Sequence, residues 1–532
     1  MPGINHDAPP AFTAAEVARY HAVGWWSQTT LSDVVRRNAT HFPDRDAYVD
    51  CLGTSLTWQE FNATADAWAA RLATAGVRAG ARIAVWHRDA AAIHTLFVAI
   101  ERCGAVVVGI GVRAGTREVA AILSTSGAQL LITDNQRHSA AVGLGIATLN
   151  IEELHELAAD VSPGPQLGAD DVFLINSTSG TTGLPKCVVH TQNRWYYFHQ
   201  LAVANARLRS EDIFLPVIPT PFGFGLWTSH TTPIHLGATT VLVDHFTPAA
   251  TCAAIERHRV TVLCCVSTQL TMIVADRASR EYDLSSLRVV FTGGEALPYR
   301  PAAAFEELSG ATILQFYGSN ETGVLSATTV EDSQERRLRT SGRIVADMSV
   351  RLFGGADGNT DVTDTGRGQP ACRGPATSLG YLDEGDHDQL FTADGWMRMG
   401  DLCEVDAGGY VRVTGRTSDF ILRGGKNISA VQVEEAVMSH PAVALAAAVP
   451  MRDPVFGEKV CVYVECVDTS SLELADLVEY LLSQGVSKEL LPERLVVLGQ
   501  LPRSSGEKVA KGQLRDVDAL GVAAGNEVGG IR

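Results

Sequence analysis

Short apolar runs alternate with stretches of helical spacing along most of the chain. The runs 82–86, 105–109 and 130–133 have the length of buried strands, and the stretch 91–102 repeats its apolar residues as a helix does. An alternation of this kind indicates βαβ units with largely parallel sheets. We therefore predict an α/β fold whose large N-terminal domain consists of βαβ-type sheets and helices.

The pattern changes close to Ser418. From there on the chain reads as a compact α+β unit, in which Ser429 and Gln432 have the spacing of a capping box ahead of an apolar helix. A chain of 532 residues is also too long for one hydrophobic core. We predict a large domain over residues 1–417 and a small α+β domain over residues 418–532.

Charge and cysteine content exclude several classes of protein. The chain has 43 Lys and Arg against 60 Asp and Glu, a formal net charge of −17, which argues against binding to nucleic acid or to an anionic membrane. Its ten cysteines show no C-x-x-C spacing, so neither a zinc site nor a disulfide framework is expected. The start of the chain lacks signal-peptide features, and Glu101 and Arg102 interrupt the most apolar stretch, 91–112. We expect a cytoplasmic protein without a membrane span.

One segment points to nucleotide chemistry. Residues 177–186 read S-T-S-G-T-T-G-L-P-K and lie between two strand-like runs, 172–175 and 187–190. Hydroxyl side chains, glycines and a basic residue suit a loop whose backbone N–H groups hold phosphates. The segment is not the common P-loop, because Pro185 and not glycine precedes Lys186. The alternative is an ordinary Ser/Thr/Gly-rich surface turn.

The segment resembles the signature loop of the adenylate-forming superfamily, the AMP-dependent synthetases and ligases. This superfamily includes acyl-CoA and aryl-CoA ligases, luciferases and nonribosomal adenylation domains. Five further segments match the same family in the same order: 293–298, 315–321, 400–416, 423–428 and 501–509. The resemblance implies that a small C-terminal domain rotates on a hinge, here Ser418, between two half-reactions.

The resemblance also implies roles for individual residues. In the family the aromatic ring at Tyr317 stacks on adenine, the carboxylate at Glu321 holds Mg²⁺, and the lysine at Lys508 grips the acid and the α-phosphate. The residues at Asp401 and Arg416 bind the ribose. The candidate catalytic residues are therefore Lys508, Glu321 and Lys186, and the candidate metal ligand is Glu321. Nucleotide or cofactor contacts are implied for Thr178, Ser179, Gly180, Thr181, Thr182, Gly183, Gly294, Glu295, Ala296, Gln315, Phe316, Tyr317, Gly318, Asn320, Asp401, Arg416, Gly424, Gly425 and Lys426.

Four positions depart from the family pattern. Asn320 stands where threonine is usual, Glu507 replaces the glycine before the lysine, and Ser418 stands where the hinge usually has aspartate or lysine. Lys511 stands where arginine is common. An amide can still bond an oxygen of the phosphate or the acid, and a hinge needs only to absorb a backbone rotation. These departures put single contacts in doubt and leave the site as a whole in place.

The predicted reaction requires two anions to meet. A carboxylate is a poor electrophile, so the family first converts it to an acyl-AMP with release of pyrophosphate, and a thiol then attacks. Cations and fixed N–H dipoles stabilise the charge that develops at phosphorus. ATP and Mg²⁺ are therefore the expected cofactors of the first half-reaction, and no side-chain nucleophile is needed.

The resemblance also implies that the acid pocket lies in the segment 219–227, which follows the phosphate loop. Aromatic rings alternate there with glycines, and the segment has no Asp, Asn or His, which favours an uncharged hydrophobic acid, either aromatic, alicyclic or short acyl. The candidate pocket residues are Pro221, Phe222, Phe224, Gly225, Trp227 and Gly293. The alternative is that these aromatic side chains only fill the core.

Several alternatives remain open at this stage. Coenzyme A is the favoured acceptor, but a carrier protein acting in trans presents the same thiol arm. Gly109, Gly111 and Ala114, with Asp134 beyond them, superficially match the dinucleotide fingerprint of an NAD(P)-dependent oxidoreductase. That reading leaves the other segments unexplained. A nonenzymatic ligand-binding relative would show damaged catalytic positions. The oligomeric state, including a homodimer, is left open.

Overall fold

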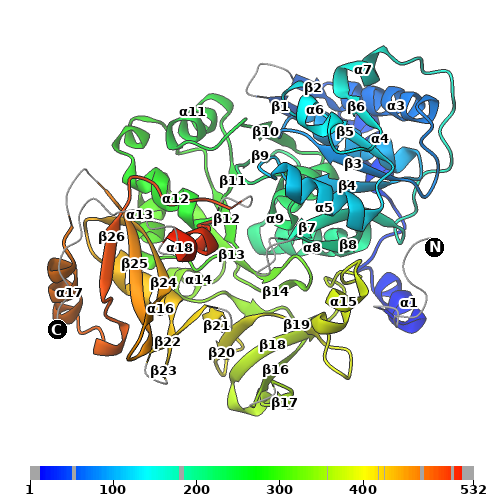
Figure 1. The fold of residues 1–532 in the computed structure, drawn as a ribbon. Coiled ribbons are helices and arrows are strands. Elements are labelled where there is room, and N and C mark those ends of the chain that lie inside the picture. Colours follow the sequence, from blue (N-terminus) through cyan, green and yellow to red (C-terminus); the bar gives the residue numbers. More distant parts are fainter. Residues whose placement is uncertain are drawn as a thin grey trace.

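The structure is a computed structural model that describes residues 12–50, 55–178, 185–355, 358–416, 419–423, 426–467, 472–504 and 508–517. It consists of a large α/β domain with several sheets and a small C-terminal α/β domain, as the sequence predicts (Figure 1). Among the described residues, no helix is long and apolar enough to cross a membrane.

The first sheet of the large domain has six strands and is mostly parallel. Its order is β6 (Thr148–Asn150), β5 (Leu130–Thr133), β3 (Arg82–Trp86), β4 (Val106–Ile110), β7 (Val172–Thr178) and β8 (Lys186–Thr191), and only β7 and β8 pair antiparallel. Its helices include α4 (Ala91–Arg102), α5 (Thr116–Ser126) and α6 (Asn135–Val142). The strands are nearly continuous apolar runs because both faces of the sheet are covered. The predicted βαβ alternation is confirmed here.

The second sheet has nine strands and carries most of the candidate site. Its order is β15 (Arg343–Ile344), β14 (Gly323–Ala327), β13 (Thr312–Ser319), β12 (Val289–Gly293), β11 (Val262–Cys264), β9 (Ile213–Pro216), β10 (Thr239–Leu242), β1 (Asp46–Asp50) and β2 (Ser55–Thr57). The strands from β13 to β1 run parallel. Their helices include α8 (Gln192–Ala206), α11 (Pro248–His258), α12 (Ser267–Ala275) and α13 (Tyr299–Ser309). The carboxyl ends of parallel strands share one edge, which is where ligands bind in such sheets.

A third, antiparallel sheet completes the large domain. It contains β17 (Thr360–Asp361), β16 (Ser349–Gly354), β18 (Arg367–Arg373), β20 (Asp401–Val405) and β21 (Val411–Arg416), with β19 (Met397–Arg398) beside β18. Its strand β20 begins at Asp401, one of the predicted ribose-binding residues.

The small domain has a sheet and a core of its own. The sheet contains β23 (Lys426–Ser429), β22 (Phe420–Arg423), β25 (Gly457–Cys466), β24 (Val443–Asp453) and β26 (Arg494–Val497), and it packs with α16 (Ala430–Met438) and α17 (Leu474–Ser483). The side chain of Ser429 accepts a hydrogen bond from Gln432 N and so caps α16, as predicted. The boundary residues 417 and 418 lie outside the described residues.

The small domain lies against helices α12 and α13 of the large domain (Figure 1). The guanidinium of Arg300 on α13 donates to the backbone oxygen of Ser439 at 2.5 Å, and Tyr480 donates to the same oxygen at 2.7 Å. Arg503 of the small domain reaches the Met272 sulfur on α12 at 3.5 Å. The two domains therefore meet at the helices that follow β11 and β12.

Candidate active site

The predicted phosphate loop connects two paired strands. Thr178 at the end of β7 lies opposite Lys186 at the start of β8. The loop between them, with Ser179, Gly180, Thr181, Thr182 and Gly183, lies outside the described residues. The hairpin nevertheless fixes its two ends side by side at the edge of the first sheet.

Tyr381 connects three of the predicted site residues. Its hydroxyl donates to Glu321 Oε1 at 2.6 Å, and Lys186 Nζ lies 5.1 Å from the centre of its ring. Burial and the Glu321 carboxylate raise the pKa of Tyr381, while a hydrogen bond with the Thr178 side chain opposes that shift. Thr178, Lys186 and Glu321 come from separate segments, so their common contact brings them to one place. No sequence motif had singled out Tyr381.

Lys186 also has an anionic partner that the sequence did not reveal. Its Nζ lies 2.8 Å from Asp386 Oδ1 on the short helix α15 (Glu384–Leu390). Both side chains are partly exposed, at 21% and 31%. An incoming phosphate would therefore compete with Asp386 for the lysine.

The predicted adenine and ribose residues also meet. The Tyr317 hydroxyl donates to Asp401 Oδ2 at 2.9 Å and lies 3.2 Å from the Cys403 sulfur. Burial raises the pKa of Tyr317, and the Asp401 charge adds to that shift. Arg416 pairs with Asp401 across β20 and β21, although its side chain is not among those described. The structure thus joins residues that lie 84 positions apart in the chain.

Lys508 of the small domain reaches the end of β12 in the large domain. A β-carbon built on Gly294 would lie only 2.8 Å from Lys508 Nζ, and Gly294 has a φ of +79°. The positive φ favours glycine at this position, and an added side chain would have to displace the end of Lys508. The neighbouring Gly293 pairs with Phe316 on β13, so Lys508 lies near the strand that leads to Tyr317 and Glu321. Glu507 lies outside the described residues.

Two of the predicted nucleotide contacts, Glu295 and Gln315, have hydrogen-bond partners within the protein, and their roles at the nucleotide stay predictions. Glu295 Oε2 accepts hydrogen bonds from the Ser267 hydroxyl at 2.9 Å and from Thr268 N at 3.2 Å, so its carboxylate holds the start of α12. Ala296 is exposed. The Gln315 amide donates to two backbone oxygens, those of Arg337 at 2.6 Å and Thr340 at 2.8 Å.

Backbone packing explains Gly318. Its backbone approaches that of Gly323 so closely that an added β-carbon would lie 1.7 Å from the Gly323 oxygen.

The glycine-rich loop of the small domain is only partly described. Gly424 and Gly425 lie outside the described residues, and Lys426 on β23 forms an ion pair with Glu489. The described contacts of Lys426 are therefore within the small domain, and its predicted role beside a pantetheine arm stays a prediction.

The predicted acid pocket begins a run of short helices. Gly223–Leu226 form α9, Trp227–Thr231 form a π-helical turn, and Thr232–Leu236 form α10. Trp227 is only 2% exposed and packs against Phe291 and Phe316 at ring-centre distances of 5.0 and 4.9 Å. Trp227 is therefore part of the core, and its predicted role in the acid pocket stays a prediction.

The remaining pocket candidates lie closer to the strand ends. Phe222 and Phe224 are half-buried, whereas Pro221 and Gly225 are buried. An added β-carbon on Gly225 would lie 2.0 Å from the Pro219 oxygen, which explains that glycine by backbone packing.

The Gly109–Gly111 segment has a packing role. A β-carbon on Gly109 would lie 2.8 Å from that of Pro221, and one on Gly111 would lie 2.6 Å from the Phe222 ring. These glycines let the predicted acid-pocket segment approach the end of β4. This packing accounts for the glycines that had suggested a dinucleotide fingerprint.

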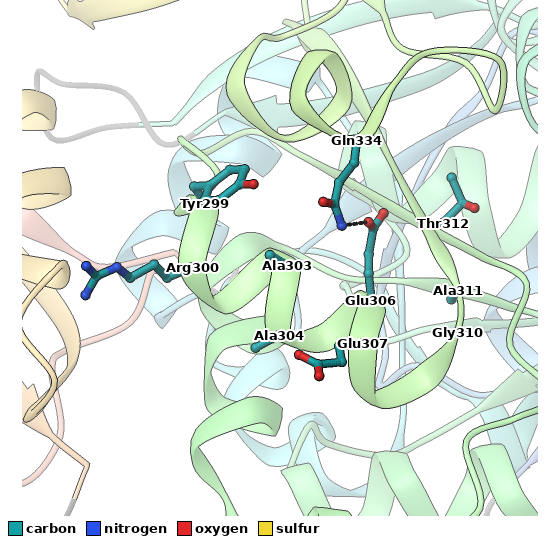
Figure 2. Close-up of a pocket in the computed structure, with 10 residues that line it drawn as sticks. All are labelled: Tyr299, Arg300, Ala303, Ala304, Glu306, Glu307, Gly310, Ala311, Thr312 and Gln334. Atoms are coloured by element: carbon teal, nitrogen blue, oxygen red, sulfur yellow. Dashed lines mark hydrogen bonds between the residues drawn. The ribbon is translucent and has the colours of Figure 1, made fainter.

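A cavity of about 640 Å³ lies elsewhere, along α13 (Figure 2). It is lined by Tyr299, Arg300, Ala303, Ala304, Glu306, Glu307, Gly310, Ala311, Thr312 and Gln334. None of the predicted site residues lines it, and Glu306 inside it is held by Gln334 at 2.8 Å. This cavity is therefore separate from the candidate active site.

Comparisons with known proteins agree with the geometry. A model of the AMP-binding enzyme family matches residues 35–382, and a model of the AMP-binding enzyme C-terminal domain matches residues 432–508. The chain belongs to this family of adenylate-forming enzymes. It is accordingly an AMP-forming ligase of the acyl-CoA synthetase type.

Individual relatives cover nearly the whole chain. A medium-chain fatty-acid–CoA ligase of Escherichia coli is 28% identical, over 95% of this chain and 93% of that protein. A salicyl-AMP ligase / salicyl-S-ArCP synthetase of Mycobacterium tuberculosis is 31% identical, over 97% of this chain and 95% of that protein. The fold matches that of an anthranilate CoA ligase in complex with anthranoyl-AMP, with a TM-score of 0.84, 23% identity and coverage of 92% and 97% of the two chains.

Proposed function

We propose that the protein activates a hydrophobic carboxylic acid with ATP and transfers the resulting acyl group to a pantetheine thiol. The acid is aromatic, alicyclic or short acyl, and coenzyme A is the favoured acceptor. The observation that carries this proposal is that Lys186, Glu321 and Thr178 meet at one tyrosine while Lys508 arrives from the other domain at the adjacent strand end. This arrangement brings a lysine, a carboxylate and two hydroxyls together, and it places a second lysine, Lys508, at the end of strand β12.

Each site residue has a separate proposed role in the formation of acyl-AMP. Lys508 and Lys186 offset the charge of the acid and the phosphates as they approach, and the loop after Thr178 offers backbone N–H groups to the phosphates. Tyr317 and Asp401, already joined by a hydrogen bond, hold the adenosine. No residue needs to form a covalent bond with the substrate.

Glu321 fits the proposed Mg²⁺ site. Its residue is 8% exposed, one carboxylate oxygen accepts from Tyr381, and Mg²⁺ commonly uses one or two carboxylates with phosphate oxygens and water as its remaining ligands. Among the residues that the structure describes, no group of three or more His, Cys, Asp or Glu could enclose a metal alone. Bound there with ATP, Mg²⁺ would supply positive charge against the phosphates.

Transfer to the thiol is proposed to follow a rotation of the small domain near Ser418. Coenzyme A is favoured as acceptor because relatives such as the fatty-acid–CoA ligase use it by name. A carrier protein is the second candidate, since another relative of similar identity is named a salicyl-S-ArCP synthetase.

Exchange of labelled pyrophosphate into ATP tests the proposal directly. The exchange is measured with aryl, alicyclic and aliphatic acids, and product thioester is then measured with coenzyme A and with a phosphopantetheinylated carrier protein. We expect exchange that requires Mg²⁺ and one class of hydrophobic acid. Absence of exchange with every acid would contradict the proposed function.

A lysine variant separates the two half-reactions. Lys508→Ala is expected to lose most of its pyrophosphate exchange but to retain thioester formation from preformed acyl-AMP, because the lysine is needed only while the two anions meet. Lys488→Ala changes an exposed lysine of the same domain and serves as the control. Equal loss of both half-reactions in Lys508→Ala would show that its role is misassigned.

A further inference from the structure

Arg194 is a fully buried arginine to which the proposed reaction assigns no role. It lies in the first turn of α8, directly after β8, and its exposed fraction is 0%. Burial lowers the pKa of its guanidinium to about 9, and the nearby Glu321 carboxylate opposes that shift. Burying a charge costs free energy, so hydrogen bonds must offset the lost hydration.

The guanidinium joins the two backbone segments that meet at Glu321. Its Nε donates to the backbone oxygen of Ala376 at 2.9 Å, and its Nη1 donates to the backbone oxygen of Asn320 at 2.7 Å. Ala376 precedes the segment that carries Tyr381, whose hydroxyl binds Glu321. The arginine therefore holds both the residue before Glu321 and the segment that contacts its carboxylate.

A second set of hydrogen bonds continues from Arg194 to the acid-pocket segment. Its Nη1 lies 2.5 Å from His190 Nδ1, and His190 Nε2 lies 2.7 Å from Asn176 Oδ1. An arginine can only donate, so His190 accepts at Nδ1 and donates from Nε2. Asn176 also accepts from Asn320 Nδ2 at 2.7 Å and donates to the Pro221 oxygen at 2.7 Å.

The chemistry of these side chains determines which group donates and which accepts in each hydrogen bond of the network. Burial and the charge of Arg194 lower the pKa of His190, so its ring stays neutral. The amide of Asn176 uses its oxygen toward His190 and Asn320 and its nitrogen toward Pro221. A buried network whose hydrogen bonds are directed in this way favours one arrangement of its side chains, although Nη2 of Arg194 has no hydrogen-bond partner among the described residues.

We infer that Arg194 is a positioning residue that holds the Glu321 turn and, through His190 and Asn176, the acid-pocket segment at Pro221 in one rigid arrangement. The inference rests on the proposed function, because it treats Glu321 and Pro221 as parts of one reaction site. It predicts that loss of the arginine misplaces the carboxylate without removing any group that touches a substrate. Displacements of about 1 Å can cost roughly 100-fold in rate.

Arg194→Met tests the inference against Arg102→Met. Arg102 at the end of α4 is also buried, at 2% exposed, and makes four hydrogen bonds to Ser32, Asn62 and Asp66, none of which is a candidate site residue. The measurements are the Mg²⁺ concentration that gives half-maximal exchange, the affinity for ATP by calorimetry with Mg²⁺ and without acid, and the melting temperature. The calorimetric measurement needs no turnover.

The expected results differ between the two arginines. Arg194→Met raises the half-maximal Mg²⁺ concentration and weakens ATP binding, each by about tenfold or more, as expected for a lost charged hydrogen-bond network. Arg102→Met lowers the melting temperature but leaves both quantities within about twofold of the wild type. If Arg194→Met does not fold, Arg194→Lys replaces it, since it keeps the charge and loses the branched geometry.

His190→Phe isolates the branch that leads to Pro221. It leaves the contacts of Arg194 with Asn320 and Ala376 in place, so the KM for the acid should rise about tenfold while the Mg²⁺ requirement stays within about twofold of the wild type. Unchanged ATP affinity and Mg²⁺ requirement in the Arg194 variant, or an equal shift in Arg102→Met, would overturn the inference. Failure of the proposed function is distinct, because the wild type itself would then show no exchange.

Discussion

Lys508 Nζ lies against Gly294, so close that a β-carbon on the glycine would be 2.8 Å from the ammonium nitrogen. The two residues are 214 positions apart and belong to different domains. Gly294 was expected to form a wall of the nucleotide pocket. Its contact with Lys508 leads to a second expectation, that the glycine leaves space for the lysine when the small domain is docked on the large one.

Gly294→Ala should therefore impair one half-reaction. The new methyl group would displace Lys508, so pyrophosphate exchange should fall at least tenfold, while thioester formation from preformed acyl-AMP changes much less. Both rates are measured on the same preparation. Gly310→Ala is the matched control, because Gly310 has a similar φ of +73° with nothing within 4 Å of an added β-carbon. A comparable loss of exchange in the control would attribute the effect to backbone strain.

Tyr317→Phe should weaken the hold on ATP. The ring remains, but the hydrogen bond of 2.9 Å to Asp401 is lost. We expect the KM for ATP to rise by about threefold to tenfold with a smaller change in kcat. The control is Tyr410→Phe, which removes a similar bond from a tyrosine to Asp332 far from the site. The KM for ATP is measured by steady-state kinetics. An equal rise of this KM in both variants would contradict the expectation.

Arg300→Ala should disfavour the docked position of the small domain. Arg300 donates to Ser439 at 2.5 Å across the domain boundary, and this docked position is also the one in which Lys508 meets Gly294. Pyrophosphate exchange should fall severalfold, whereas thioester formation from acyl-AMP should stay unchanged or increase. Arg336→Ala is a suitable control, since Arg336 is an exposed arginine paired within the large domain with Asp406.

Acid should destabilise the protein through its buried histidines. Burial lowers the pKa of His230 to about 3, and it also lowers the pKa of His94 and His190. The unfolded chain takes up protons below about pH 6.5 while these folded rings stay neutral, so their contribution to stability is complete above that pH and is lost as the pH falls. Between the unfolded and folded pKa values, each such ring lowers the free energy of unfolding by about 1.4 kcal/mol for every unit by which the pH falls.

The measurement is the free energy of unfolding by urea between pH 7 and pH 4. His230→Asn should reduce the slope by about one proton equivalent, roughly 1.4 kcal/mol per pH unit. The control is His245→Gln, which replaces a ring that is exposed at the surface instead of buried. A slope that stays the same in His230→Asn would show that this ring is not the source of the acid sensitivity.

Local sequence patterns predicted much of the fold. The apolar runs 82–86, 130–133 and 172–175 lie in strands β3, β5 and β7, because a strand covered on both faces must be almost continuously apolar. The cap at Ser429 and the small domain behind it could be predicted for a similar reason, since a side-chain cap acts within four residues. Motif order then indicated the adenylate-forming family.

The contacts between distant segments could not be predicted in this way. Tyr381, Asp386 and Arg194 carry no motif, yet they join the ends of β7, β8 and β13. Glu295 and Gln315 lie inside motifs, and in the structure their side chains form hydrogen bonds with the start of α12 and with α14 (Gln334–Arg339). A motif records which residue types a site needs, but the partner of each side chain depends on which strand ends lie side by side.

The sequence by itself determined the alternation of strands and helices, the small α+β unit and the class of reaction. The first two follow from spacing and residue type over short stretches of chain, and the class of reaction follows from the resemblance of the motifs to the adenylate-forming family. Only the tertiary structure decided that Lys508 meets Gly294, that Tyr381 joins Lys186 to Glu321, and that Gly109 and Gly111 make room for Pro221 and Phe222. The physical reason is that such contacts depend on how two sheets and two domains pack, and distances across those boundaries are not encoded in any single segment.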